Sequence, residues 1–363
     1  MIRALVGLAI AAIVSGCSGA ATAPPAATTT PLAAATAVKT ASASTSAVAS
    51  PSAATAAWRR IADLPTPRSE VAAAVSHGSI VFVAGGQGSP QRVERYDATA
   101  ERWDRAPDLP VGVDHAMAAA SEGLQSSAPQ GVFVFGGYLA NGSPTARSFR
   151  FDGAAARWEE IAPMPAPRAA GAAVELGGSI FIVGGADGSH LIAPTYEYSV
   201  FTRQWRTVAA LPTPRDHLAG AAVGGKVCAV GGRQLSMSLN LAAFECYDPG
   251  ADSWTRMPDA PTARGGIGAA AYGGRLYVVG GEQPSGTYRE VDIFDQRANA
   301  WTRGPDLPNP RHGVGVVVVE GTKSIVGGDP VFTVFTPARL LVLGGGPLPG
   351  GSQTAVCEAL DLR

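Results

Sequence analysis

The sequence lacks several features that are typical of particular classes of protein. Its 363 residues include 28 basic and 29 acidic side chains, a formal charge of -1. This balance argues against binding to nucleic acid or to membranes through a polybasic surface. Only three of the basic residues are lysine, so arginine is the default cation and a single arginine carries little information.

Motifs of catalysis are also scarce. Five histidines occur, and none forms a His-x-His or His-Glu-x-x-His pair, so the sequence predicts no metal site, zinc included. There is no Gly-x-Ser-x-Gly nucleophile turn and no phosphate-binding glycine loop. From motifs alone we therefore expect no catalytic residue and no cofactor.

The N-terminus has the pattern of an export signal. Arg3 precedes an apolar run over residues 4–14, which is the length of a signal-peptide core and is shorter than the roughly 20 residues of a membrane-spanning helix. The following letters, VSGC, resemble the lipobox of bacterial lipoproteins. The resemblance implies that residues 1–16 are removed and that Cys17 carries lipid, which anchors the protein on the periplasmic side of a membrane or at the cell surface. The alternative is an ordinary signal peptide with an incidental cysteine.

A polar, low-complexity segment follows. Residues 18–57 are almost wholly Ala, Thr, Ser and Pro, and Lys39 is the only charged residue among them. Such a composition cannot bury enough apolar surface to offset the entropy lost on ordering. We expect residues 17–57 to form the lipidated cysteine and a flexible tether, about 35 Å long on average.

An internal repeat occupies the rest of the chain. Each tryptophan is followed seven residues later by proline, at Trp58, Trp103, Trp158, Trp205, Trp254 and Trp301. Each unit of about 47–55 residues then has a run of small residues, an apolar strand ending in Gly-Gly, a variable loop, an alternating strand ending near an acid, and the tryptophan strand. Alternation and turn residues predict four short β-strands per unit.

This order of parts points to one architecture. Gly-Gly can adopt positive φ where a strand ends, and tryptophan can pack between neighbouring sheets. Four-stranded sheets arranged radially are β-propeller blades. The sequence of Gly-Gly, a Tyr/Phe-Asp pair and Trp resembles the kelch repeat, whose period is about 50 residues. The resemblance covers residues 58–363 and implies an all-β, six-bladed kelch propeller.

The unit boundaries predict how the ring closes. The first unit has only its tryptophan strand, at Trp58, whereas the last unit, from Arg311, has no tryptophan. The N-terminal strand must therefore be the outer strand of the C-terminal blade. In the last unit, residues 321–346 contain two Gly-Gly ends, at Gly327 and Gly344. We expect Gly344 to end the regular strand, with about residues 324–340 inserted.

Two cysteines lie in neighbouring strands of the fourth blade. If Val230 faces Phe244, then Cys228 faces Cys246 across one hairpin. An exported protein can keep a disulfide there, and the alternative is a pair of small buried side chains. Cys357 has no evident partner.

Five arginines recur at one position of the repeat, the corner at which the chain leaves the outer strand of one blade and enters the innermost strand of the next. We expect these side chains near the central channel and predict that they bind the ligand, together with His115 and His217; the second blade has Val113 in place of the arginine. In other kelch domains arginines on this face bind acidic peptides, so the resemblance implies an acidic ligand. The alternative is pairing with Glu70, Asp114, Asp216 or a turn aspartate. The five residues are Arg68, Arg168, Arg215, Arg264 and Arg311.

The resemblance implies a function only as a class. The first interpretation is a monomeric, lipid-anchored binding module that holds a protein, peptide or glycan at a propeller face. The alternative is an enzyme acting on a sugar, because kelch propellers include exported, six-bladed N-acetylneuraminate epimerases. A third interpretation is a structural module of the cell envelope. A fold alone does not choose between them.

Overall fold

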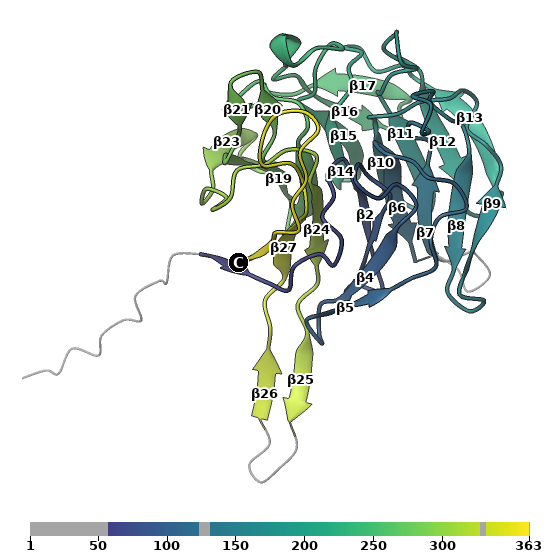
Figure 1. Ribbon diagram of the computed structural model, residues 1–363. Helices are drawn as coiled ribbons and strands as arrows, with labels where there is room; N and C mark the ends of the chain where they lie inside the picture. The colour runs from purple at the N-terminus through teal and green to yellow at the C-terminus, as the bar shows by residue number, and fades with distance from the viewer. Residues whose placement is uncertain (1–56, 123–130, 327–331, 363) are drawn as a thin grey trace, which may run out of the picture. The chain divides into compact units, whose positions relative to one another are not determined.

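The computed structural model describes residues 57–122, 131–326 and 332–362, and every structural statement below refers to these. This part of the chain contains six four-stranded antiparallel sheets arranged around an axis as propeller blades (Figure 1). Its one helical segment is the three-residue 3-10 turn η1 (Met237–Leu239). Among the described residues, no helix has the length and apolar character needed to cross a membrane. Cys17 and the expected tether up to residue 56 lie outside the described residues.

Each blade runs from an inner strand at the axis to an outer strand at the rim. Blade one comprises β2 (Ala72–Ser76), β3 (Ile80–Ala84), β4 (Val93–Asp97) and β5 (Arg102–Arg105). Blade two comprises β6 (Met117–Ser121), β7 (Gly131–Phe135), β8 (Ser148–Asp152) and β9 (Arg157–Ile161). Blade three comprises β10 (Ala172–Leu176), β11 (Ser179–Val183), β12 (Thr195–Ser199) and β13 (Gln204–Val208).

The remaining blades follow the same plan. Blade four comprises β14 (Ala219–Val223), β15 (Lys226–Val230), β16 (Phe244–Asp248) and β17 (Ser253–Arg256). Blade five comprises β18 (Gly268–Tyr272), β19 (Arg275–Val279), β22 (Val291–Asp295) and β23 (Ala300–Arg303), with the small hairpin β20 (Glu282–Gln283) and β21 (Gly286–Thr287) in its loop. Blade six comprises β24 (Gly315–Val319), β27 (Arg339–Leu343), β28 (Cys357–Asp361) and β1 (Trp58–Arg60).

Strand composition follows position in the blade. Five of the six inner strands are rich in Ala and Gly, since the strands converge on one axis and leave little room for side chains; the exception is β24, with four valines. The second strands, such as β3 and β11, are buried on both faces and are rich in Val, Ile and Phe. The loops between second and third strands, and the corners between blades, lie on one face, the upper face (top in Figure 1). The tight turns lie on the lower face.

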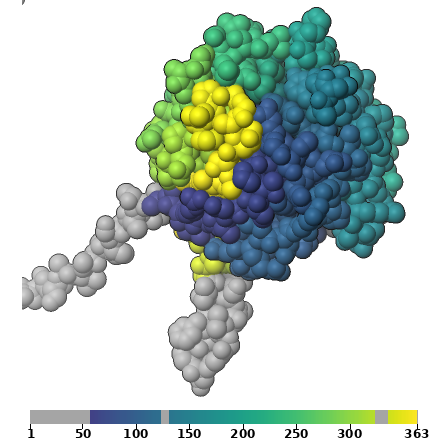
Figure 2. All heavy atoms as spheres, in the orientation of Figure 1, coloured from purple at the N-terminus to yellow at the C-terminus, as the bar shows by residue number. Residues whose placement is uncertain are grey.

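The ring closes as the sequence predicted. β1 pairs with β28 in antiparallel register, with Trp58 opposite Leu360 and Arg60 opposite Glu358. Figure 2 shows the N-terminal and C-terminal parts of the described chain side by side on the surface. This pairing covers the edge of β28, which would otherwise expose unpaired backbone groups.

The tryptophans tie each blade to the one before it. In all six, the indole Nε1 donates a hydrogen bond of 2.8–3.0 Å to a backbone carbonyl four residues after the tryptophan of the preceding blade. Trp58 obeys the same rule, because its indole bonds to the carbonyl of Pro305 and links blade six to blade five. The expected packing of tryptophan between sheets is confirmed, and a directional bond is added to it.

The irregular sixth blade also follows the expectation. β27 pairs with the inner strand β24, and its last residue, Leu343, is followed directly by Gly344, so Gly344 is confirmed as the glycine at the regular strand end. The inserted residues contain an additional hairpin, β25 (Lys323–Val326) with β26 (Phe332–Phe335), which extends from the lower face (Figure 1). Gly327, the rejected alternative, lies outside the described residues.

The fourth blade contains a disulfide. Val230 is opposite Phe244, and Cys228 is bonded to the directly opposite Cys246, with 4.0 Å between their Cα atoms. Of the two alternatives considered for this pair, the structure therefore has the disulfide. Cys357 is free and buried, and burial raises the pKa of its thiol to about 11.

The five corner arginines do not line the channel, and this expectation is wrong. Arg68, Arg168, Arg215, Arg264 and Arg311 are each at most 1 % exposed. Arg215 shows the common arrangement. Its guanidinium donates to the carbonyls of Gly231 and Ala229, at 2.6 and 2.9 Å, and to the carboxylate of Glu245 at 2.6 Å. The side chain thus runs into its own blade and fixes the corner to the second and third strands.

The partner of each corner arginine occupies one position in the repeat, the second residue of the third strand. Four arginines pair there with an acid at 2.6–2.7 Å, in the pairs Arg68–Glu94, Arg215–Glu245, Arg264–Asp292 and Arg311–Glu358. Arg168 instead lies 4.3 Å from the ring centre of Tyr196. Blade two, which has Val113 at the corner, has Phe149 at this position. None of the acids considered from the sequence is the partner.

The letters LPTPR occur twice, at residues 64–68 and 211–215, and this contact explains why. The leucines, Leu64 and Leu211, are buried at 1 % exposure. The threonines donate to the second carboxylate oxygen of the same acid, Thr66 to Glu94 and Thr213 to Glu245, both at 2.8 Å. Each buried carboxylate therefore has a partner at both oxygens, which is what a buried ion pair needs to be tolerated.

Closure can be tested by two truncations. Deleting residues 18–56 should leave the melting temperature unchanged, whereas deleting residues 18–65 removes β1 and the buried Ile61 and Leu64 and should abolish cooperative unfolding. Thermal unfolding followed by circular dichroism compares the two. Equal melting temperatures would rule out a structural role for the closing strand.

The corner ion pairs can be tested by giving blade four the two residues that blade two has at the same positions. Arg215→Val or Glu245→Phe alone leaves one charge buried without its partner and should cost about 3–5 kcal/mol of unfolding free energy. The double variant reproduces the Val113 and Phe149 combination of blade two and should recover a large part of that loss. Urea unfolding measures all three. Wild-type stability in Arg215→Val would show that the arginine does not hold the corner.

Candidate functional site

The axis is closed on the upper face by a ring of six equivalent residues, one from the start of each blade. Five backbone hydrogen bonds of 2.7–3.1 Å link the six members in order, each from the N–H of one member to the carbonyl of the member before it. Every member has φ between 50° and 66°, in the left-handed region. The axial ring consists of Glu70, His115, Ala170, His217, Gly266 and Gly313.

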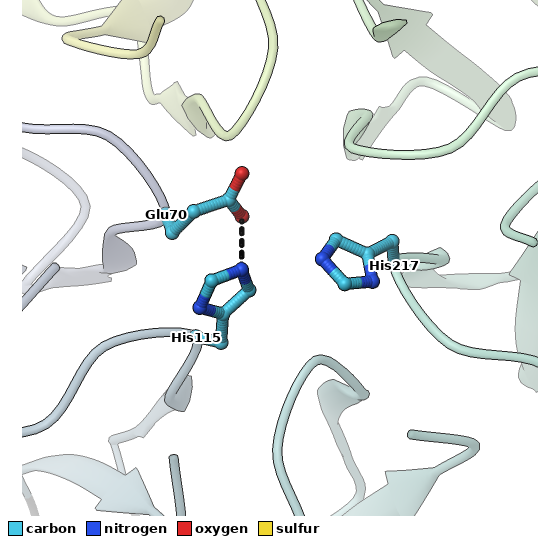
Figure 3. A group of neighbouring side chains, drawn as sticks. All are labelled: Glu70, His115 and His217. Carbon is cyan, nitrogen blue, oxygen red and sulfur yellow. Dashed lines mark ion pairs between the residues drawn. The ribbon is translucent and has the colours of Figure 1, made fainter. Parts of the chain in front are cut away.

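Three members of the axial ring carry polar side chains despite this backbone conformation. Left-handed φ suits the glycines and costs other residues about 1–2 kcal/mol each. Strain of this kind is retained mostly where a side chain has a task. In this ring all four members other than glycine have this conformation, Ala170 included, and the side chains of Glu70, His115 and His217 point toward one another (Figure 3).

These three side chains, the axial triad, form a compact group. His115 Nε2 lies 3.5 Å from Glu70 Oε2, and the two imidazole rings lie 4.9 Å apart between centroids and almost perpendicular. One oxygen or nitrogen atom from each residue falls within 4.8 Å of the other two. A cavity of about 80 Å³ adjoins them on the axis, lined by the ring and by the residue that follows each ring member, just before the inner strand begins.

Each member of the axial triad is held from behind by another side chain. Asp114 contacts His115 Nδ1 at 2.6 Å, and Asp216 contacts His217 Nδ1 at 2.7 Å. His312 Nδ1 lies 3.0 Å from Glu70 Oε1, and its Nε2 donates to the carbonyl of Leu348. The atoms that face the axis are consequently the two Nε2 nitrogens and Glu70 Oε2.

A second layer of charges surrounds this group. Arg233 bonds to Glu282 at 2.7 Å and lies 3.9 Å from Asp216. Glu282 also accepts a hydrogen bond from the backbone N–H of Gly350 and lies 3.6 Å from His312. Around the axis, four carboxylates thus face one arginine and three histidines, so the balance of charge depends on the histidines.

Burial and neighbouring charges set the protonation of the cluster. Burial alone would raise the pKa of Glu70, but His115 and the bond from His312 lower it overall. Burial opposes protonation of His115 and of His312, yet Glu70 together with the other nearby carboxylates raises the pKa of both. His217 differs, because burial and the nearby His115 lower its pKa in spite of Asp216. A readily protonated imidazole therefore lies beside one that tends to be neutral.

The sequence located part of this site. His115 and His217 were predicted, with the five arginines, to bind the ligand; the structure places both histidines at the axis and the arginines inside their own blades. Glu70 was considered only as an arginine partner, and a metal-ligating set was not expected because no two histidines are close in the sequence. The fold brings together histidines from two different blades. Aligning the residue two positions after each corner would have shown Glu, His, Ala, His, Gly and Gly in one ring.

A larger cavity, about 660 Å³, lies on the lower face between blades one and two and is lined in part by Phe82, Val132 and Phe151. It includes Gly131, which adjoins residues 123–130 outside the described part of the chain. We assign no site to it.

Comparisons with known proteins agree with this architecture. The Kelch motif family model matches residues 214–261 and 263–308. Kelch-like protein 38 of Rattus norvegicus is 27% identical over 187 residues, and that of Homo sapiens is 28% identical over 187 residues. These alignments span 50% of this chain and 30% of each relative, so the match covers less than a third of the relatives' length. The family-model matches and the six four-stranded blades in the described residues support a kelch-repeat propeller.

Proposed function

We propose that the protein is a binding module that holds a protein partner on the upper-face loops of blades four to six. A kelch propeller is typically a protein-interaction module. The observation that carries the proposal is a connected loop surface with exposed leucines beside the axis. This surface comprises residues 231–243, 280–290 and 344–356, and we call it the loop surface.

Hydrogen bonds between blades hold the loop surface together. Asn240 donates to the carbonyl of Glu282 at 2.7 Å, which joins the loops of blades four and five. Thr287 donates to the carbonyl of Pro347 at 3.1 Å, which joins the loops of blades five and six. A surface connected in this way loses little conformational entropy on binding, and such preorganisation favours affinity.

The chemistry of the loop surface favours an apolar contact. Leu235, Leu239 and Leu348 are 48%, 53% and 67% exposed. The segment 344–356 has no charged residue, and Arg233, the one charge in 231–243, pairs with Glu282 of the segment 280–290, which also contains Arg289 and Glu290. With the corner arginines buried as well, an acidic ligand loses the support that the sequence pattern lent to it. A protein with apolar side chains fits better than an acidic peptide or a sugar acid.

A second candidate is an enzyme that acts on a sugar. The axial acids and histidines favour it, because a histidine held by a carboxylate can act as a general base. Faster exchange between the anomers of N-acetylneuraminate in the presence of the protein, measured by NMR, would distinguish this candidate from a binder.

We also propose that the module is exported and anchored through lipid on Cys17. The signal-like N-terminus and its resemblance to a lipobox support this location. The Cys228–Cys246 disulfide supports it independently, because disulfides persist mainly in oxidising compartments.

The loop surface can be tested with matched variants on opposite faces. Leu239→Asp with Leu348→Asp places charges on the upper face, and Phe201→Asp does the same at a lower-face side chain that is 60% exposed. The leucine pair should weaken capture of the partner at least tenfold, whereas Phe201→Asp should not. Affinity for each partner identified by cross-linking measures this. Loss of binding in Phe201→Asp alone would place the interface on the lower face.

The nature of the contact can be tested on the same partner. Apolar binding should change less than about threefold between 0.1 and 0.5 M salt, because screening acts on exposed charges. A steep loss of affinity with salt would instead indicate an ionic interface.

Anchoring can be tested at the proposed lipid site. Cys17→Ser removes the thiol that accepts lipid, so the variant should appear as an uncleaved precursor or in the soluble fraction. Membrane fractionation and intact mass report both outcomes. An unchanged mass and location would exclude lipidation of Cys17 while leaving the loop surface unaffected.

A further inference from the structure

We propose that Glu70, His115 and His217 form a binding site for one divalent transition-metal ion, with zinc as the ion that fits best, on the axis of the propeller. The inference does not depend on the partner proposed above. It rests on the donor atoms, their spacing, the groups that hold them, and the charge around them.

The donor atoms suit zinc. Two imidazole nitrogens and one carboxylate oxygen form a set that zinc accepts, whereas magnesium and calcium prefer oxygen alone. Three atoms that all lie within 4.8 Å of one another share a point no more than about 2.8 Å from each. Side-chain rotations that move each donor atom by less than 1 Å would shorten its distance to that point to the roughly 2.0–2.2 Å of zinc coordination.

The contact between His115 and Glu70 leaves room for an ion. Their facing atoms are 3.5 Å apart, longer than the 2.7–3.2 Å of a good hydrogen bond. The adjoining cavity of about 80 Å³ has room for an ion and several waters, since one water occupies roughly 10–15 Å³ by the same measure. Three protein ligands would leave at least one coordination position open to water or to a ligand.

The supporting residues are those of a metal site. Imidazoles that bind metal almost always donate their other N–H to a carboxylate or carbonyl, which fixes the ring. Asp114 and Asp216 occupy this place behind His115 and His217, at 2.6 and 2.7 Å. His312 holds the far oxygen of Glu70 in the same way, and both of its own nitrogens are already engaged. His312 therefore supports the site and is not a ligand.

The charge around the axial triad also favours a bound cation. When His115 and His217 are neutral, as metal ligands must be, the four carboxylates of Glu70, Asp114, Asp216 and Glu282 outnumber the two remaining cationic groups, Arg233 and His312. A divalent ion would balance this excess at the point where the three donor atoms meet.

The test measures zinc bound to the full chain, prepared without a polyhistidine tag and stripped with a chelator. After equilibration with Zn²⁺ and dialysis, the wild type should retain one equivalent by elemental analysis. Co²⁺ as a substitute probe should give a visible absorption band from nitrogen and oxygen ligands. Less than about 0.1 equivalent of either ion on folded wild-type protein would overturn the proposal.

Variants distinguish the axial triad from any other site. His115→Asn and His217→Asn are chosen because asparagine tolerates left-handed φ, so the ring should still form. Together they should lower zinc affinity more than about 100-fold, and Asp216→Asn should lower it about 10–100-fold with the ligands intact. His190→Asn, at an 81% exposed histidine on the same face, is the matched control and should bind as wild type does.

Folding is checked separately by circular dichroism and melting temperature. A folded double variant that still binds zinc as tightly as the wild type would overturn the assignment to these residues. If the double variant does not fold, Asp216→Asn and the cobalt band of the wild type decide the question. Wild-type affinity in Asp216→Asn would then count against the site.

Discussion

A buried guanidinium fixes the start of the inner strand in five of the six blades, and the axial site depends on that contact. The corner arginine is bonded to the second and third strands of its own blade, and the axial ring residue follows it by two positions. The corner therefore determines which side chain reaches the axis and in what direction. Blade two has Val113 in place of the arginine. Val113 is fully buried, so apolar contact replaces the ion pair there. Stability and the candidate site are built from neighbouring residues of the same repeat but use different side chains.

The fold could be predicted from the sequence because its signals repeat. Six tryptophans, the Gly-Gly strand ends and the unpaired first and last units specify the number of blades, the closing strand and the strand end at Gly344. The function of the arginines could not be read from the same pattern. Only the corner residues of the units were compared, whereas the acid that pairs with each arginine lies in the third strand, some 26–47 residues away. The acid appears in four of the five blades that have the arginine, which a comparison of whole units would have shown.

The axial triad was hidden for a different reason. Glu70, His115 and His217 come from three blades, and only the rotation of the blades about the axis brings them within reach of one another. No local motif can signal such a site. What the sequence does contain is a repeat position at which three residues are small (Ala170, Gly266 and Gly313) and three are large and polar. In a propeller, where the core is built from the repeating residues, departures from the repeat at the axis mark the positions free to acquire a function.

Diffraction from crystals of the zinc-loaded protein, recorded at the zinc absorption edge, tests the account most directly. The account predicts one anomalous peak on the axis, at about 2.0–2.2 Å from Glu70, His115 and His217, with the five corner guanidinium groups buried against their own blades. A peak elsewhere, no peak at all, or arginines extended into the channel would contradict it.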